Sequence, residues 1–346
     1  MIYTQISNPT TTSIWTATAT TNASPTKFSL SDGTNSVDYL GSFIYSNGSL
    51  TSGTVTGIVG YTGSAPDYSV TGGNWNVVTF GSYLNSGDSA ALLEFMAAGN
   101  DTWNGSNFAD LMEHIGTGDD VVNGNGGNDI IRTSAGNDTI DGGSGFDTTA
   151  FSSNRANYTI SKAGSTVSVK ATTGTDGTDT LTNIEYLQFT DQPVVIAPAN
   201  TSNQYAALLY QGALGRTPDP TGLAYWRDLA ENLSPSTKAM GLYGLSDATG
   251  NFNGNLSIAG GFTQSTEFIS KYGSLTNNQF VTQLYANVLD RTPDPSGLSD
   301  WVGQLSRGTT REHVLIGFAE SAEAVANATV GFVGIHGHHD AWLILS

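Results

Sequence analysis

The sequence predicts a multidomain protein of the β plus α class, with a β-rich N-terminal region and an all-α C-terminal domain. Apolar and polar residues alternate through residues 1–95, an aspartate returns every nine residues through 96–151, and apolar residues follow helical spacing through 205–328. The intervening segments predict closing strands at 152–196, a linker at 197–204 and a C-terminal tail at 329–346.

Composition restricts the classes of partner. The chain has 346 residues, enough for two or three domains, and a formal net charge of −18 although only 12% of its residues are charged. Such a chain repels nucleic acid and anionic membrane surfaces and offers many carboxylates to cations. We therefore expect no nucleic-acid partner and no membrane insertion. The absence of cysteine excludes disulfides as the stabilising element of a chain with 42 glycines.

Residues 1–95 are predicted to form short strands joined by tight turns. In FSLSDGTNSVDYLGSFIYSNGS, Ser, Val and Tyr alternate with other residues, and Asp-Gly and Asn-Gly pairs interrupt the pattern. No catalytic constellation is present there, and the acidic residues are restricted to Asp32, Asp38, Asp67, Asp88 and Glu94. A glycan-binding surface in this region would need exposed aromatic residues on one face, such as Trp15, Tyr61 or Trp75.

Nine-residue units are clearest in residues 124–150, which read GNGGNDIIR, TSAGNDTID and GGSGFDTTA. The sixth place of each unit is an aspartate, and the eighth is Ile131, Ile140 or Thr149. The register extends back to three further aspartates if one residue is inserted near His114, although Phe108 stands where glycine is expected. The six aspartates of this register are Asp101, Asp110, Asp120, Asp129, Asp138 and Asp147.

The repeated residue types suit a hard cation. Glycines allow a turn whose backbone carbonyls point inward, the following aspartate adds a carboxylate, and the residue two places later enters a core. Calcium takes about six to eight oxygen ligands in flexible geometry. Because every second unit turns on the same side, Asp129 and Asp147 are expected in one row, and Asp120 and Asp138 in the other.

These units resemble the calcium-binding repeats of the RTX, or haemolysin-type, family, whose consensus is GGxGxDxUx. The resemblance implies a short parallel β-roll that binds Ca²⁺ through aspartate carboxylates and turn carbonyls, and that depends on the metal for folding. The alternative is a glycine-rich loop whose Asn and Asp residues merely cap turns. The candidate ligands are Asp101, Asp110, Gly118, Asp120, Gly124, Gly126, Gly127, Asp129, Gly136, Asp138, Gly142, Ser144, Gly145 and Asp147.

A second, longer repeat predicts the helical domain. YQGALGRTPDPTGLAYW begins at Tyr210 and YANVLDRTPDPSGLSDW at Tyr285, an offset of 75 residues. These segments resemble a domain family of unknown function in secreted proteins, which is distantly similar to phycobilisome linker domains. Asp219 and Asp294, each before a proline, are candidate helix caps that pair with a nearby arginine; the alternative is that they bind calcium. Thr309 and Glu312 fit a capping box.

The two ends of the chain suggest a route of export. The first 15 residues lack the basic and apolar regions of a cleavable signal peptide, and no apolar run approaches the about 18 residues of a transmembrane helix. The chain ends HDAWLILS, which is similar to the uncleaved tails that type I secretion machinery reads in RTX-like proteins. An ordinary terminal strand or helix is the alternative. We expect an extracellular protein at the surface of a bacterium.

Enzyme signatures such as GxSxG, HExxH or a phosphate loop are missing, so the sequence predicts no enzyme. The HGHHD segment at 336–340 could take a transition metal, but it lies in the tail. The predicted function is a structural or adhesive surface protein of the S-layer or filament type, which assembles with itself or contacts other surface proteins or glycans. The alternative is a glycan-binding module or a carbohydrate-active enzyme with its site in residues 1–95.

Overall fold

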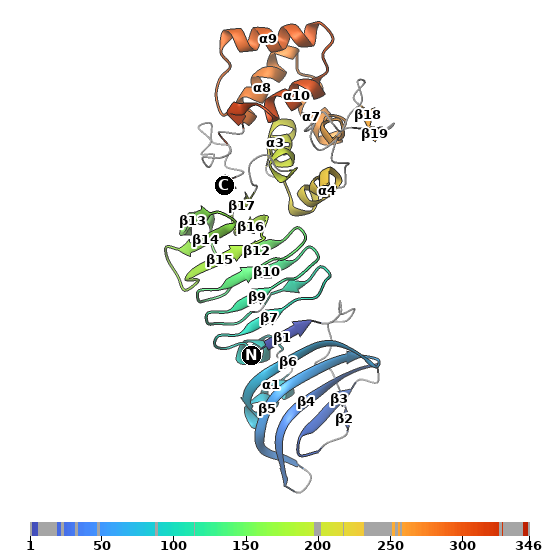
Figure 1. The fold of residues 1–346 in the computed structure, drawn as a ribbon, viewed down its shortest axis with the longest axis vertical. Coiled ribbons are helices and arrows are strands. Elements are labelled where there is room, and N and C mark those ends of the chain that lie inside the picture. The colour runs from blue at the N-terminus through green and yellow to red at the C-terminus, as the bar shows by residue number, and fades with distance from the viewer. Residues whose placement is uncertain are drawn as a thin grey trace. The chain divides into compact units, whose positions relative to one another are not determined.

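The computed structural model divides into two compact units: Met1–Ile184 with Gln188–Thr190, and Glu185–Leu187 with Asp191–Ser346. Strands dominate the first unit and helices the second (Figure 1). The predicted fold class is therefore confirmed: a β-rich region with parallel strands precedes a helical region. The structure describes residues 2–5, 19–21, 24–31, 34–46, 49–86, 89–113, 115–196, 202–216, 218–231, 251–252, 255–256, 258–324, 327 and 342–344.

An antiparallel sheet opens the first unit. Its strands run in the order β6-β5-β4-β3-β2. Glycine is required at the register shift after Leu40, because a Cβ on Gly41 would lie 2.0 Å from the Thr54 carbonyl oxygen. The strands are β2 (Ala19–Thr21), β3 (Lys27–Ser31), β4 (Asn35–Ser46), β5 (Ser49–Thr62) and β6 (Ala65–Asn76).

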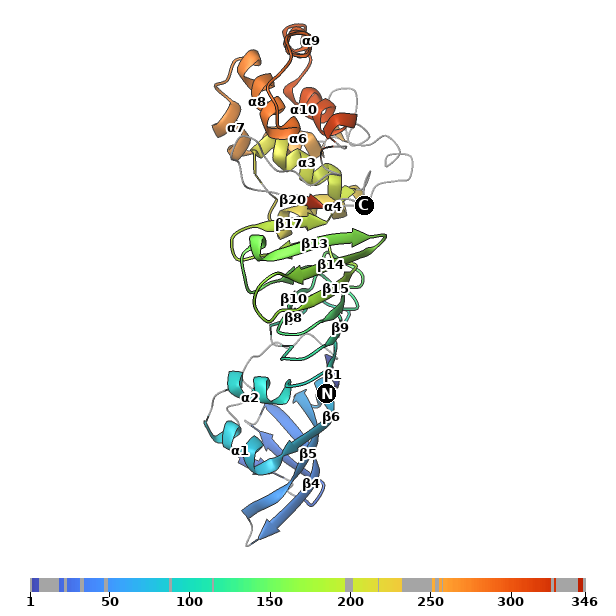
Figure 2. The ribbon, with the colours of Figure 1, turned by 90° about the vertical axis from the view of Figure 1, so that its left-hand side faces the viewer.

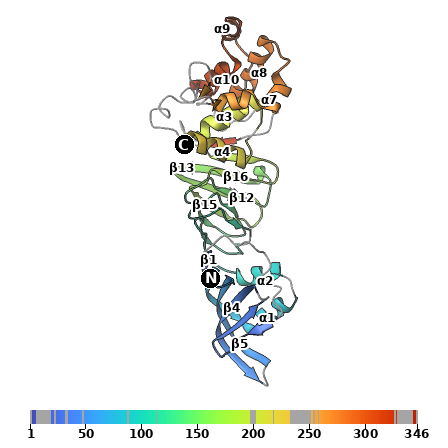
Figure 3. The ribbon, with the colours of Figure 1, turned by 90° about the vertical axis from the view of Figure 1, so that its right-hand side faces the viewer.

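Helices α1 (Val77–Ser86) and α2 (Ser89–Met96) cover one face of this sheet, as Figures 2 and 3 show from opposite sides. Alternation in the sequence predicts only strands here, so this part of the expectation is wrong. The Asn76 carboxamide accepts the backbone N–H of Val78 at 3.0 Å and so begins α1. The short helices are held by packing, because Phe80 lies 5.5 Å from the Tyr39 ring and 6.0 Å from the Trp75 ring.

The nine-residue units form two parallel sheets that face each other. One sheet contains β7 (Thr102–Asn104), β9 (Val121–Asn123), β11 (Thr139–Asp141) and β15 (Thr178–Thr182). The other contains β8 (Leu111–Met112), β10 (Ile130–Arg132) and β12 (Thr148–Ala150). The eighth residue of each unit enters the core between the sheets: Trp103, Met112, Val122, Ile131, Ile140 and Thr149 are all buried.

Strand register confirms the one-residue insertion. Ile131 pairs with Thr149, 18 residues later, but with Met112, 19 residues earlier. His114, where the insertion is placed, lies outside the described residues. Strand β1 (Ile2–Gln5) pairs in parallel with β7 and antiparallel with β6, which joins the β-roll and the antiparallel sheet into one sheet of 12 strands.

After the consecutive units, the chain makes a hairpin before it returns to the first sheet. The hairpin consists of β13 (Tyr158–Ala163) and β14 (Thr166–Ala171), and β14 pairs antiparallel with β15. Strand β16 (Tyr186–Gln188) follows. In the second unit, β17 (Pro193–Ile196) pairs in parallel with β20 (Trp342–Ile344), so part of the predicted export tail is a strand. The remaining tail residues, including the HGHHD segment, and linker residues 197–201 lie outside the described residues.

The helical region contains two copies of one arrangement. Helices α3 (Ser202–Leu214) and α4 (Pro220–Glu231) reappear 75 residues later as α8 (Asn277–Leu289) and α9 (Pro295–Ser306). The first copy continues through β18 (Asn251–Phe252), β19 (Asn255–Leu256), α6 (Ile258–Thr263) and α7 (Thr266–Tyr272), and the second through α10 (Arg311–Ala319). No helix among the described residues is long and apolar enough to span a membrane.

Equivalent side chains pack within each copy. Trp226 stacks on Phe262 with ring centroids 5.0 Å apart, and Trp301 packs on Phe318 at 5.4 Å.

The predicted capping box at Thr309 is wrong by one residue: Thr310 is the N-cap of α10, and its side chain accepts the backbone N–H of His313.

Glycine-to-alanine substitutions in this domain are expected to have opposite signs. A Cβ on Gly317 would lie 2.6 Å from the Trp301 ring, so Gly317→Ala should destabilise the domain despite alanine's higher helix propensity. A Cβ on Gly303 would meet only the flexible end of Arg307 at 3.2 Å, so Gly303→Ala should stabilise by about 0.5–1 kcal/mol. Thermal unfolding of both variants checks this; equal effects of the same sign would contradict it.

Candidate metal centre

Aspartates of alternate units stack in two rows, one along each side of the β-roll. We call Asp101, Asp120, Asp138 and Asp179 the first row, and Asp110, Asp129 and Asp147 the second row. In the first row, the backbone N–H of each aspartate donates to Oδ1 of the aspartate in the next layer, at 2.8, 3.1 and 3.0 Å. The same bonds in the second row measure 2.8 and 2.8 Å. The predicted division of the aspartates between two sides is therefore what the structure shows.

The second carboxylate oxygen is the unusual atom of these rows. Asp120, Asp129 and Asp179 are at most 1% exposed, and their Oδ2 atoms are buried with no hydrogen-bond partner among the described residues. A buried anion without a partner is strongly unfavourable, so these oxygens fit a bound cation. Asp110 differs, because Ser106 supplies its backbone N–H to Oδ2 at 2.6 Å and its hydroxyl to both oxygens at 3.1 Å.

Burial changes the protonation of these carboxyls. It raises the pKa of Asp120 and Asp129 to about 7 and that of Asp179 to about 8. Neighbouring carboxylates contribute to these raised pKa values, and the backbone N–H bond at Oδ1 opposes the rise. Burial raises the pKa of Asp101, Asp110 and Asp138 as well. Without a cation, the rows therefore bind protons in its place.

Glycine at the fourth place of a unit is required by the turn. Gly118, Gly127, Gly136 and Gly145 have φ between 109° and 139°. A Cβ on Gly136 would lie 1.9 Å from the Gly118 carbonyl oxygen, and one on Gly145 would lie 1.7 Å from that of Gly127. The turns consequently stack backbone on backbone, which places carbonyl groups close to the carboxylates of each row.

In the units that carry the second-row aspartates Asp129 and Asp147, the first residue must be glycine. A Cβ on Gly124 would lie 2.3 Å from Oδ2 of Asp129, and one on Gly142 would lie 2.7 Å from Oδ2 of Asp147. The turn therefore closes over its own carboxylate. The third places, Gly126 and Ser144, form a parallel bridge in which the Ser144 carbonyl accepts the N–H of Gly127 at 3.0 Å.

The carboxylate and carbonyl oxygens of the rows fit calcium better than a transition metal. No group of three His, Asp or Glu side chains converges within the described part of the chain, and cysteine is absent from the sequence. The available ligands are carboxylate and carbonyl oxygens, which are the hard donors that Ca²⁺ prefers. A bound Ca²⁺ would supply positive charge to the unpartnered oxygens, and Asp120, Asp129, Asp138, Asp147 and Asp179 with the adjoining turn carbonyls would hold it.

Asp179 is the residue that the sequence analysis missed. It lies 41 residues after Asp138 rather than 18, because the β13–β14 hairpin separates its turn from the consecutive units. The sequence does contain a signal: residues 174–182 read GTDGTDTLT, with glycine fourth, aspartate sixth and leucine eighth.

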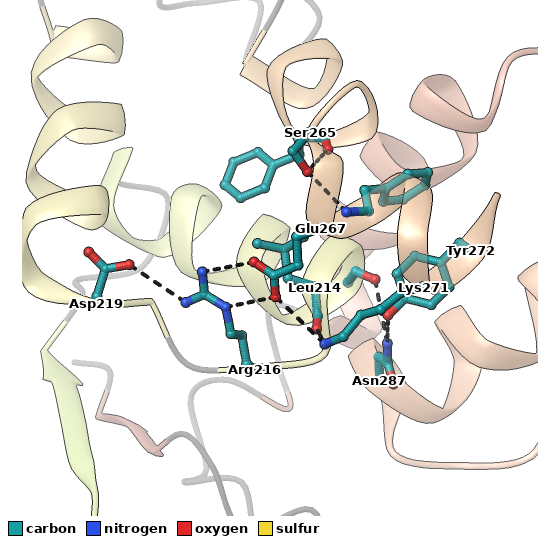
Figure 4. A network of polar contacts seen from close by, with 11 residues as sticks. Leu214, Arg216, Asp219, Ser265, Glu267, Lys271, Tyr272 and Asn287 are labelled. Carbon is teal, nitrogen blue, oxygen red and sulfur yellow. Dashed lines mark hydrogen bonds and ion pairs between the residues drawn. The ribbon is translucent and has the colours of Figure 1, made fainter.

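The helical region offers a capping and ion-pair network rather than a metal site (Figure 4). Asp219 Oδ1 accepts the N–H of Gly222 at 2.8 Å, and Asp294 does the same for Gly297, so both serve as caps. Arg216 binds Glu267 through two hydrogen bonds of 3.0 and 3.1 Å and lies 3.6 Å from Asp219, as Figure 4 shows. The Arg216 hydrogen bonds lower the pKa of Glu267.

Among the described residues of the N-terminal region, two candidates for the alternative site, Trp75 and Asp38, have structural partners. Trp75 belongs to the core, where its indole N–H donates to the Met96 carbonyl at 3.3 Å, so it offers no surface to a sugar. Asp38 pairs with Lys27 and accepts the Ser29 hydroxyl at 2.6 Å. Trp15, Asp32 and Asp88 lie outside the described residues.

A parallel roll with buried carboxylates in every turn defines a cation-binding repeat protein. Residues 114–149 match the RTX calcium-binding nonapeptide repeat, in four copies, and residues 197–253 and 259–328 match a domain of unknown function, DUF4214. The chain therefore carries an RTX calcium-binding repeat and a DUF4214 domain. The structure of the extracellular lipase LipA from Serratia marcescens is similar with 27% identity and a TM-score of 0.24, over 26% of this chain and 14% of that chain. No curated protein matches.

Substitution of a row carboxylate should change stability in opposite directions with and without calcium. Asp129→Asn retains an acceptor for the Asp110 N–H but removes a buried charge. We expect the variant to be more stable than the parent in chelator, and to require at least about tenfold more calcium for folding. Urea unfolding followed by circular dichroism measures both. The control is Glu113→Gln, an exposed carboxylate of the roll, which should change neither; destabilisation in chelator would contradict the prediction.

The calcium-free roll should lose stability as pH rises. The pKa of Asp120 and Asp129 is about 7 in the folded state and about 3.9 in an unfolded chain, so the folded state holds more protons between these values. Its stability is therefore greatest below about pH 4 and falls until about pH 7 to 8. Hydrogen exchange of the β9–β11 amides in chelator, corrected for intrinsic rates, measures this locally. Stability that increases between these pH values would contradict it.

Proposed function

We propose that this chain is a secreted structural protein of a bacterial surface or matrix, whose β-roll folds when Ca²⁺ binds outside the cell. The observation that supports this proposal is the stacking of buried carboxylates in two rows with unpartnered oxygens at Asp120 and Asp129. Cytosolic calcium is scarce, so the roll would stay loose before export. An export route through type I machinery, which reads a C-terminal segment, fits such delayed folding.

Self-assembly is the second element of the proposal. Leu111 and Ile130 are register partners on the outward face of β8 and β10, and they are 60% and 46% exposed. Exposed apolar residues on neighbouring strands favour contact with another protein surface. We take that surface to be a second copy of this chain, as in an S-layer or filament, and assign no catalytic role. This face would form only after calcium orders the strands that carry it.

Light scattering and negative-stain electron microscopy during a calcium titration test the assembly proposal. We expect particles larger than a monomer only with calcium. The paired substitution Leu111→Thr with Ile130→Thr should abolish assembly but leave calcium-dependent folding unchanged. The control is Val121→Thr, on the outward face of the other sheet, where the side chain is 41% exposed. A calcium-loaded monomer at all protein concentrations would refute assembly by this chain alone and direct the search to glycans.

A further inference from the structure

We propose that residues 174–182 are a displaced calcium-binding repeat, in which Asp179 completes a metal site with Asp138 at the end of the first row. This inference rests on the calcium-dependent folding proposed above. The RTX match ends at residue 149, so residues 174–182 lie outside the matched repeats.

The displaced turn stacks like a consecutive one. In the preceding layer, the Gly118 N–H donates to the Ala135 carbonyl at 2.9 Å, and the Asn137 N–H donates to Asp119 at 2.8 Å. In the displaced layer, the Gly136 N–H donates to the Thr175 carbonyl at 3.2 Å, and the Thr178 N–H donates to Asn137 Oδ1 at 2.9 Å. The fifth-place bond therefore recurs although 41 residues separate the two aspartates. The fourth-place glycine instead bonds to the second place of the displaced unit, Thr175, rather than to the third place as in the preceding layer.

Backbone crowding is also reproduced. A Cβ on Gly177 would lie 2.0 Å from the Gly136 carbonyl oxygen, against 1.9 Å between Gly136 and Gly118. Strand β15 continues the first sheet, with Leu181 opposite Ile140 and fully buried. The turn thus has the position, the glycine and the core residue of a unit.

The carboxylate of Asp179 is the main evidence that a cation binds here. It is 1% exposed, its Oδ1 accepts the Asp138 N–H at 3.0 Å, and its Oδ2 is buried with no hydrogen-bond partner in the described part of the chain. This is the same state as that of Asp120 within the matched repeats. A cation bound to this Oδ2 atom would offset the free-energy cost of burying the carboxylate charge.

The other acid of this turn has a different partner. Asp176 accepts the hydroxyl groups of Ser152 and Tyr158, which lie at the start of the inserted segment. The Ala171 N–H, at the end of β14, donates to the Gly177 carbonyl at 2.8 Å. The hairpin therefore holds the displaced turn in place from both of its ends, and Asp179 remains for the metal.

Calcium counting on the purified full chain tests the proposal. Equilibrium dialysis at saturating Ca²⁺ gives the ions bound per chain for the parent, Asp179→Asn and the matched control Asp176→Asn, which keeps an acceptor for Ser152 and Tyr158. We expect Asp179→Asn to bind one ion fewer than the parent and Asp176→Asn to bind the parental number. Equal numbers and affinities for Asp179→Asn and the parent would overturn the proposal. A parent that binds no calcium would refute the proposed function as well.

Hydrogen exchange on the parent chain provides a test that needs no variant. The amides of residues 174–182 should become protected over the same calcium range as those of 133–141. Protection of 174–182 that is independent of calcium would show that the hairpin alone orders the turn, and would overturn the inference even if Asp179→Asn fails to fold.

Discussion

The repulsion between carboxylates stacked one strand apart is the constraint on which the rest of this structure depends. Neighbouring strands lie about 4.8 Å apart, and unit charges at that separation repel by roughly 3–4 kcal/mol at an effective dielectric constant of 20. Backbone N–H groups of the row satisfy one oxygen of each carboxylate after the first, as in the bond from Asp120 to Asp138. They cannot neutralise the charge, and so each row needs either protons or a cation. A cation that binds in the rows would therefore stabilise the fold.

The same spacing that creates this repulsion also builds the core. Nine residues per half-turn place Asp138 in a row and Ile140 between the sheets, so one register fixes both the ligand and the hydrophobic contact. Neither can shift without the other, because a slip of one residue would expose Ile140 and bury its polar neighbours. Cation or proton binding in the rows and core packing would thereby be coupled, which explains how a chain rich in glycine can adopt one structure once the charge of the rows is neutralised.

Local patterns predicted most of the β-roll and of its rows, because each unit carries its own turn, ligand and core residue. The prediction failed where a distant contact decides the structure. Helix α1 depends on Phe80 packing against Tyr39, which alternation in residues 77–86 does not reveal. Asp179 escaped notice because the β13–β14 hairpin breaks the nine-residue spacing. In the helical region, the 75-residue offset and the Asp-Pro pairs predicted both copies and the caps at Asp219 and Asp294.

Both the inserted hairpin of the first unit and the duplicated helices of the second unit contain contacts that fix the backbone of a turn or loop. A repeat stack ends in an unsatisfied turn, and a buried carboxylate such as Asp179 can stay there only if the backbone around it is fixed. The hairpin fixes it through Asp176 and Gly177. In the helical region, each copy fixes its own interhelical loop with an Arg-Glu pair, Arg216 with Glu267 and Arg291 with Glu323. These ion pairs are half exposed and need no metal, so the proposed calcium dependence concerns the β-roll.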